Sequence, residues 1–173
     1  MRLLLAFLSV VILSGCAGYV VGPIKPTPMK SVRRIHVPNV QNDTLYPRVE
    51  VFLTNLLIKQ IQQDGTYEIV DENRADAILK VKLNDVERRP ARSVRGNILQ
   101  TREYLLNLRC RYEVVKADTG VVLDNRVVVG STSFYVSGVT ISTADSIQDE
   151  RQAIPLAAED LAIRITSLIS EGW

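Results

Sequence analysis

The chain has 173 residues, of which 46% are apolar, 23% charged and 6% aromatic, and its 21 Lys plus Arg nearly cancel its 19 Asp plus Glu. These values exclude a disordered tail, a collagen-like chain and a highly basic nucleic-acid binder. Two cysteines and one histidine exclude a disulfide-dense scaffold, a cysteine-rich zinc module and a multi-histidine metal site. The length suits one domain whose core is large enough to fold without disulfide bonds or a structural metal.

Residues 1–15 have the pattern of a secretory signal peptide, with Arg2 followed by an apolar run over residues 3–13. This run is too short to span a bilayer, because a spanning helix needs roughly 20 apolar residues. Small residues then precede a cysteine, in the order Leu13-Ser14-Gly15-Cys16, which resembles the bacterial lipobox. By this resemblance the signal is cut before Cys16, which becomes the lipidated N-terminus. The alternative is an ordinary signal peptide followed by a chance cysteine.

A lipid on Cys16 would anchor the protein to a membrane without spanning it. Ala17 follows, and no Asp comes after it to suggest retention in the inner membrane. By analogy with bacterial sorting rules, we expect attachment to the outer membrane on its periplasmic side. Three prolines (Pro23, Pro26 and Pro28) make residues 16–30 an extended tether that precedes a single folded domain over residues 31–173.

Hydrophobic periodicity predicts the first strand around residues 32–40 and a helix over residues 46–63, with Pro47 in its first turn and Gly65 at its C′ position. The helix carries an apolar stripe at helical spacing: Val49, Phe52, Leu53, Leu56, Leu57 and Ile61. Residues 67–70 form a short strand. Two longer strands follow, with strict alternation of apolar and polar residues over 77–84 and 104–114.

A last strand is predicted over residues 121–136, and a second helix over 145–170. Ser146 and Asp149 resemble a capping box, and Pro155 either kinks this helix or marks its true start. The expected fold class is α/β, more closely an α+β sandwich. Two helices pack on one face of a mixed four- to five-stranded sheet, in the order β-α-β-β-β-β-α.

The residue types that carry most enzyme chemistry are not arranged for it. His36 lies within an apolar strand, so a structural role is the simpler interpretation, and no G-x-S-x-G elbow, P-loop or dinucleotide fingerprint occurs. Cys110 falls on the apolar face of its strand and reads as a small buried hydrophobe. We therefore expect no catalytic residues, no cofactor, no metal and no enzymatic activity.

Basic residues gather in the middle of the chain. The strand alternation places Lys80, Lys82, Arg109 and Arg111 on the polar face of the sheet, opposite the helices. A second group, expected in a loop or at a strand end, consists of Arg88, Arg89, Arg92 and Arg95. Because like charges side by side destabilise a sheet, a cross-strand basic patch suggests an anionic ligand or partner, although a merely solvated face is an equal alternative. Nucleic acid fits poorly, since no aromatic residues interleave with the basic ones. The abundant phosphorylated polyanion of a bacterial envelope is lipopolysaccharide.

Several segments together resemble the LptE family of outer-membrane lipopolysaccharide-assembly lipoproteins, over the whole mature chain. The segments are Cys16-Ala17-Gly18-Tyr19, Ile35-His36-Val37-Pro38-Asn39-Val40-Gln41-Asn42, Leu53-Thr54-Asn55-Leu56-Leu57, Gly65-Thr66-Tyr67-Glu68-Ile69-Val70, Ala75-Asp76-Ala77-Ile78-Leu79, Glu103-Tyr104, Asp118-Thr119-Gly120 and the last helix with Leu161-Ala162 before Trp173.

The resemblance implies two helices on a four-stranded sheet, placed inside the lumen of a large outer-membrane β-barrel, LptD. There such a protein plugs the barrel, assists its assembly and helps deliver lipopolysaccharide to the outer leaflet. The implied partners are LptD, lipopolysaccharide and, through the lipid, the membrane. No family motif coincides with the basic positions, so their assignment to lipopolysaccharide comes from charge and alternation alone. Two other hypotheses are an accessory or ligand-carrying lipoprotein of a different envelope transport system, and a purely structural lipoprotein.

Overall fold

The computed structural model describes residues 25–94, 97–136 and 143–171. The expected signal peptide, the lipidated Cys16 and most of the tether lie outside this range. The elements in chain order are η1 (Thr27–Met29), β1 (Arg34–His36), β2 (Gln41–Asn42), α2 (Val49–Asp64), β3 (Glu68–Ile69), η2 (Glu72–Arg74), β4 (Ala77–Val94), β5 (Asn97–Lys116), β6 (Val122–Tyr135) and α3 (Thr143–Glu171).

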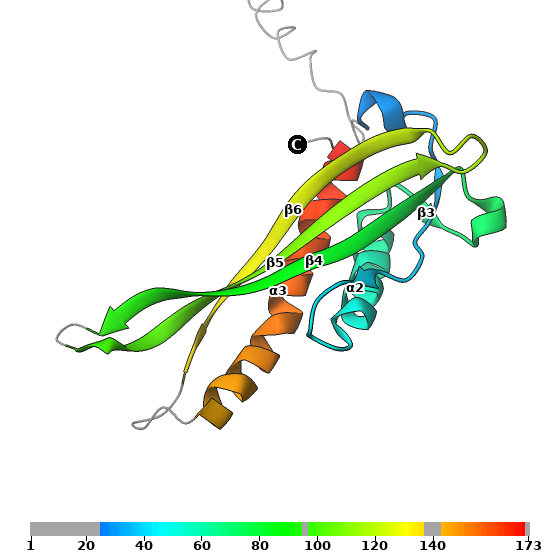
Figure 1. Cartoon of the computed structure of the whole chain (residues 1–173). Helices are drawn as coiled ribbons and strands as arrows, with labels where there is room; N and C mark the ends of the chain where they lie inside the picture. Colours follow the sequence, from blue (N-terminus) through cyan, green and yellow to red (C-terminus); the bar gives the residue numbers. More distant parts are fainter. Residues whose placement is uncertain (1–24, 95–96, 137–142, 172–173) are drawn as a thin grey trace, which may run out of the picture.

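One mixed sheet of six strands carries both helices on a single face (Figure 1). The strand order is β3-β1-β4-β5-β6, and β2 also pairs with β4. The short strands β1 and β2 run parallel to β4, whereas β4, β5 and β6 form an antiparallel meander. The predicted α+β class is therefore confirmed. The additional strand arises because residues 41–42 reach β4 and pair with Lys82 and Leu83.

The core lies between the sheet and the two helices. As the alternation predicts, the helix-facing side chains of β5 are fully buried: Leu106, Leu108, Cys110, Tyr112 and Val114. Burial raises the pKa of the Cys110 thiol to about 12, so this residue is an inert part of the core. His36 is half-buried in β1, with its Nδ1 atom 3.0 Å from the carbonyl oxygen of Val70, which fits a structural role.

Helix α2 begins at Val49, three residues later than the sequence predicts, because the side chain of Asn42 organises the preceding turn. The Oδ1 atom of Asn42 accepts hydrogen bonds from the backbone N–H and the hydroxyl of Thr44, and the Nδ2 atom of Asn42 donates to the carbonyl of Tyr46. Pro47 therefore precedes the helix. At the C-terminal end of α2, the prediction that Gly65 ends the helix is confirmed: Gly65 has φ 74° and its N–H donates to the carbonyl oxygen of Ile61.

The apolar stripe of α2 differs from the prediction at one position. Phe52 is 49% exposed, whereas Thr54 is buried. The hydroxyl of Thr54 donates to the carbonyl of Glu50 and accepts from the N–H of Val40, at 2.7 and 3.0 Å. A polar side chain can occupy the core face because both of its hydrogen-bonding needs are met there.

Strand β4 continues far beyond the predicted segment and ends at Val94, so of the two alternatives expected for the group Arg88–Arg95, a loop or a strand end, the strand end holds for the residues described. Pro90 pairs with Tyr104 of β5, and β1 and β2 pair with β4 only as far as Leu83. The other side of β4 is thus a free edge at Pro90, where a missing N–H is tolerated. Past the end of β6, strands β4 and β5 continue as a two-stranded ribbon (Figure 1).

Helix α3 is continuous through Pro155. Because the helix already begins at Thr143, Ser146 and Asp149 lie inside it, and the predicted capping box is wrong. Buried residues on both sides of the proline hold this part against the sheet: Ala153, Ile154, Ala157 and Ala158. At the start of the fold, Met29 is fully buried, so the core includes a residue of the segment expected to be a tether.

Asp76 joins the start of β4 to β1. Its carboxylate accepts the backbone N–H groups of Arg33 and Arg34 at 3.0 and 2.9 Å, and pairs with the guanidinium of Arg34 at 2.7 Å. The Arg34 side chain, and then its backbone N–H, lower the pKa of Asp76 to about 2. A carboxylate with a depressed pKa stabilises the fold above its unfolded pKa, near 3.8, and loses this contribution as the pH falls towards 2.

Replacing Asp76 by Asn should therefore lower the free energy of unfolding at neutral pH by about 1–2 kcal/mol, after allowance for solvent screening. The difference from the wild type should disappear as the pH falls from about 4 to about 2. Urea titrations over this pH range measure it. Asp71→Asn is the control, because its ion pair with Arg74 is exposed and should contribute almost nothing. A constant deficit at all pH values would contradict this role of Asp76.

Candidate functional site

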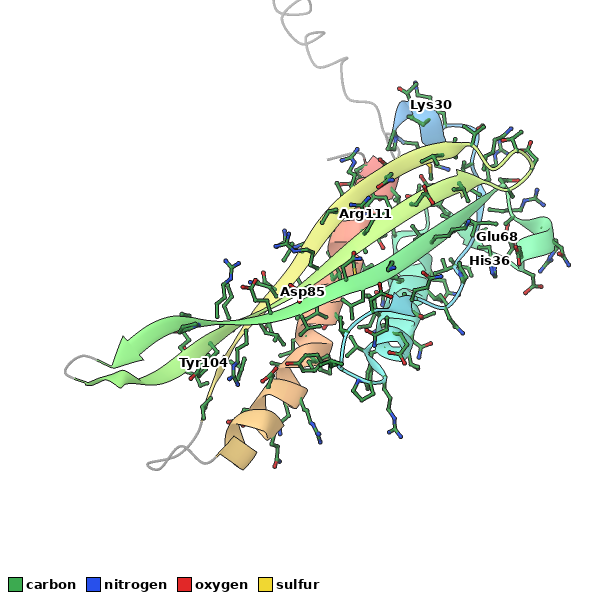
Figure 2. The ribbon with its side chains drawn as sticks, viewed as in Figure 1. Lys30, His36, Glu68, Asp85, Tyr104 and Arg111 are labelled. Carbon is green, nitrogen blue, oxygen red and sulfur yellow. The ribbon has the colours of Figure 1, made fainter. Side chains whose placement is uncertain are left out.

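The open face of the sheet, opposite the helices, carries the four basic side chains that the alternation predicted for it. Lys80 and Lys82 come from β4, and Arg109 and Arg111 come from the adjacent strand β5. Lys82 lies directly across from Arg111, so two cations meet on neighbouring strands. We call these four residues the basic surface. Arg111 is labelled on the sheet in Figure 2.

Acidic side chains share this face with the basic surface. Lys82 Nζ lies 2.6 Å from Asp43 Oδ2, and in the strand register Lys80 lies opposite Glu113 and Arg109 opposite Asp85. Exposed pairs of this kind contribute little to stability. Lys82 and Arg111 are nevertheless directly opposed like charges, which destabilise a sheet, and the ion pair of Lys82 with Asp43 offsets part of their repulsion.

A hollow of about 500 Å³ lies beside these opposed cations. Strands β2, β4, β5 and β6 and the segment between β1 and β2 line it, and the lining residues are Pro38, Asn39, Gln41, Lys80, Val81, Lys82, Arg111, Tyr112, Glu113 and Asn125. The side chains include three cations and three amides, which are donors that bind phosphate or carboxylate oxygens. The arrangement can thus hold an anionic group at the sheet surface.

Arg88 does not belong to the basic surface, which corrects the expected grouping. The register between β4 and β5 shifts between Leu83 and Asp85, so the side chains beyond this point exchange faces, and Arg88 pairs with the buried Leu106. On the helix side, its guanidinium lies 3.1 Å from the buried carboxylate of Glu150 in α3. It also lies 5.0 Å from the centre of the Tyr104 ring.

This half-buried cluster around the buried Glu150 joins three parts of the fold. The hydroxyl of Tyr46 also donates to Glu150, which raises the pKa of the tyrosine to about 12. Tyr104 stacks on Phe134 of β6, with ring centres 5.6 Å apart. The sequence contains one signal for this arrangement, because the apolar positions of β4 change from odd to even numbers between Leu83 and Val86.

The other predicted basic residues separate. Arg89 lies farther along the open face, opposite Leu105, and pairs with Glu87 at 2.7 Å. Arg92 lies within β4, and Arg95 lies outside the described residues. The eight predicted residues therefore do not form one patch.

Sequence reasoning missed an apolar row next to the basic surface. Val127 of β6 lies across from Arg111, and Val129 across from Arg109, and these valines are 50% and 36% exposed. Tyr135, farther along the strand, is 64% exposed. Cations beside exposed apolar side chains suit a partner that is both anionic and apolar.

In the part of the chain that the structure describes, no three His, Cys, Asp or Glu side chains gather as a metal site would require. Within the same ranges, neither helix combines the length and the apolar character needed to cross a membrane.

Two helices on one face of a mixed sheet, with the other face open, define an α+β sandwich. A family model described as lipopolysaccharide-assembly, LptE, matches residues 32–169, so the chain belongs to this family. The family is one of non-enzymatic lipoproteins that act in lipopolysaccharide assembly. No curated protein matches the chain.

Solved structures share the fold at low sequence identity. A minor lipoprotein from Acinetobacter baumannii is 19% identical, with a TM-score of 0.52 over 80% of this chain and 93% of that one. A hypothetical protein from Chlamydia trachomatis is 7% identical, with a TM-score of 0.54 over 80% and 96%. PelC from Paraburkholderia phytofirmans, solved as a dodecamer, is 12% identical, with a TM-score of 0.51 over 87% and 96%. At these identities the likeness concerns the fold alone.

Proposed function

We propose that this protein is a lipid-anchored component of the lipopolysaccharide translocon on the periplasmic side of the outer membrane. In this role it occupies the lumen of the β-barrel LptD, assists the assembly of the barrel and helps pass lipopolysaccharide to the outer leaflet. Membership of the lipopolysaccharide-assembly family supports the process. The barrel, the membrane and the anchor come from the resemblance described above.

We further propose that the basic surface contacts the phosphate groups of lipopolysaccharide. The observation that carries this assignment is the direct opposition of Lys82 and Arg111 beside a hollow whose lining includes three cationic and three amide residues. Asp43 already pairs with Lys82, and an anion bound between the two cations relieves the repulsion that remains. The neighbouring Val127 and Val129 supply an apolar surface for the acyl part of the same molecule.

Reversing Arg109 and Arg111 to Glu should weaken lipopolysaccharide binding. Each exposed contact contributes about 0.5–1 kcal/mol, so losing two should weaken binding about fivefold to thirtyfold. Added salt should weaken binding in the wild type, because the contacts are exposed. Titration of purified lipopolysaccharide in detergent measures both effects. Folding should change little, since both side chains are exposed.

The matched control reverses two exposed lysines away from the sheet face, Lys30 and Lys59, and changes the net charge by the same amount. This control should bind almost as the wild type does. Equal losses in both double variants would mean that total charge, and not the basic surface, governs binding. Detergent pull-down of the wild type separately tests the barrel: recovery without LptD would favour an accessory lipoprotein of another transport system.

A further inference from the structure

Strand β6 forms an open edge of the sheet. Among the residues that the structure describes, it pairs only with β5, over residues 122–135, and its register with β5 is continuous from Asp124 to Tyr135. Proteins commonly protect such edges with a proline, a bulge or a covering element. Within this strand there is no proline, and no bulge interrupts that stretch.

A hydrogen bond that one α3 side chain accepts shows which backbone groups of β6 face outward. The N–H of Ser131 donates to the Asp160 carboxylate at 2.9 Å, so this N–H points away from β5. In an antiparallel pair, the N–H and C=O groups of alternate residues point to the same side. The register is unbroken here, so the backbone groups of Val129 and Val127 also point to the open edge.

A groove of about 580 Å³ runs along these groups, between β6 and α3. Its lining comprises Arg126, Val127, Val128, Val129, Ile163, Arg164, Ser167 and Leu168. Ile163 is 45% exposed and gives the groove an apolar side. The two arginines already have partners, Asp124 and Asp160, so neither charge is uncompensated in the groove.

We propose that this groove binds a short extended segment of another polypeptide, which adds to the sheet as a strand beside β6. The alternating donors and acceptors of Val127 and Val129 require a partner with the same spacing, which an extended backbone supplies. Apolar side chains of the segment pack against Ile163. Asp160 occupies the edge at Ser131, so the available ladder is short and suits a segment of a few residues. The compensated arginines argue against an acidic peptide.

Backbone hydrogen exchange on the full-length protein in detergent tests the proposal. In the absence of peptide, the amides of Val127 and Val129 should exchange quickly. The amides of Val128 and Gly130, which face β5, should exchange slowly. The probe is the peptide acetyl-Thr-Val-Thr-Val-Thr-amide at millimolar concentration. It should slow exchange at Val127 and Val129 by at least several-fold.

Two variants separate edge pairing from nonspecific contact. Val129→Pro removes a donor that faces the groove and leaves the β5 ladder intact, so the peptide should no longer protect Val127, whereas Val129→Thr keeps the donor and should retain protection. If the proline variant fails to fold, Ile163→Lys serves instead, since this side chain is half exposed, and it should also lose protection.

Three outcomes would overturn the proposal. The peptide could leave exchange at Val127 and Val129 unchanged, or protect Val129→Pro and Ile163→Lys as well as the wild type. The edge amides could also be protected without peptide and become exposed on dilution, which would identify the occupant as a second copy of this chain.

Discussion

Replacing Gly130 by Ala should lower the free energy of unfolding by about 3 kcal/mol, at the upper end of the usual cost of overpacking. A Cβ atom at Gly130 would lie 2.4 Å from the carbonyl oxygen of Ala157 and 2.4 Å from Leu161 Cβ. The first is a backbone atom of α3, so the helix itself must move away from β6. Urea denaturation followed by circular dichroism measures the loss.

Gly120→Ala provides the matched control. Gly120 has φ +68°, and a Cβ there would meet no atom within 4 Å, so the substitution introduces backbone strain without a clash. Its expected cost is about 1–2 kcal/mol. If Gly130→Ala costs no more than this control, α3 does not pack against β6 as closely as the structure shows.

The close contact at Gly130 has a consequence beyond stability. The same crossing brings Asp160 to the N–H of Ser131 and forms one wall of the groove along β6. Displacing α3 should therefore also alter exchange at the edge amides. Nothing in residues 121–136 alone indicates this contact, because it depends on which residues of a helix far along the chain reach the strand.

The parts of the fold that the sequence predicts well are those in which a local pattern decides the structure. Alternation in β5 assigns Leu106 and Tyr112 to the core, and Gly65 ends α2 because a left-handed residue is needed there. The start of α2 depends instead on one side chain, Asn42, which holds the preceding turn. Helix periodicity contains no information about that turn.

For the candidate site, the decisive feature is the shift in register after Leu83. Before it, alternation places Lys80 and Lys82 correctly on the open face; after it, the side chains exchange faces and Arg88 lies on the helix side. A one-residue shift exchanges the two faces of a strand, and the acid that receives Arg88 lies in α3. Val127 was missed because its strand is apolar on both faces, and the open edge becomes visible only when the sheet is assembled.

Replacing Cys16 by Ser should abolish lipid attachment altogether. The lipoprotein peptidase should leave the signal uncleaved, and metabolic labelling with palmitate should give no labelled protein. The folded domain should remain intact, because Cys16 precedes the part of the chain that the described core uses, which includes Met29 and Val32. Gel mobility reports the uncleaved signal, and circular dichroism reports the fold.

The second cysteine makes this experiment unambiguous. The sequence contains two cysteines, and Cys110 is fully buried in β5, where its thiol is protonated and inaccessible. Cys110→Ala should therefore keep the full palmitate signal, although the lost buried volume should cost some stability. Palmitate label that persists in Cys16→Ser and disappears in Cys110→Ala would show that the lipid is attached to Cys110 and not to Cys16. In that case the segment Leu13-Ser14-Gly15-Cys16 would be an ordinary cleavage region followed by a chance cysteine.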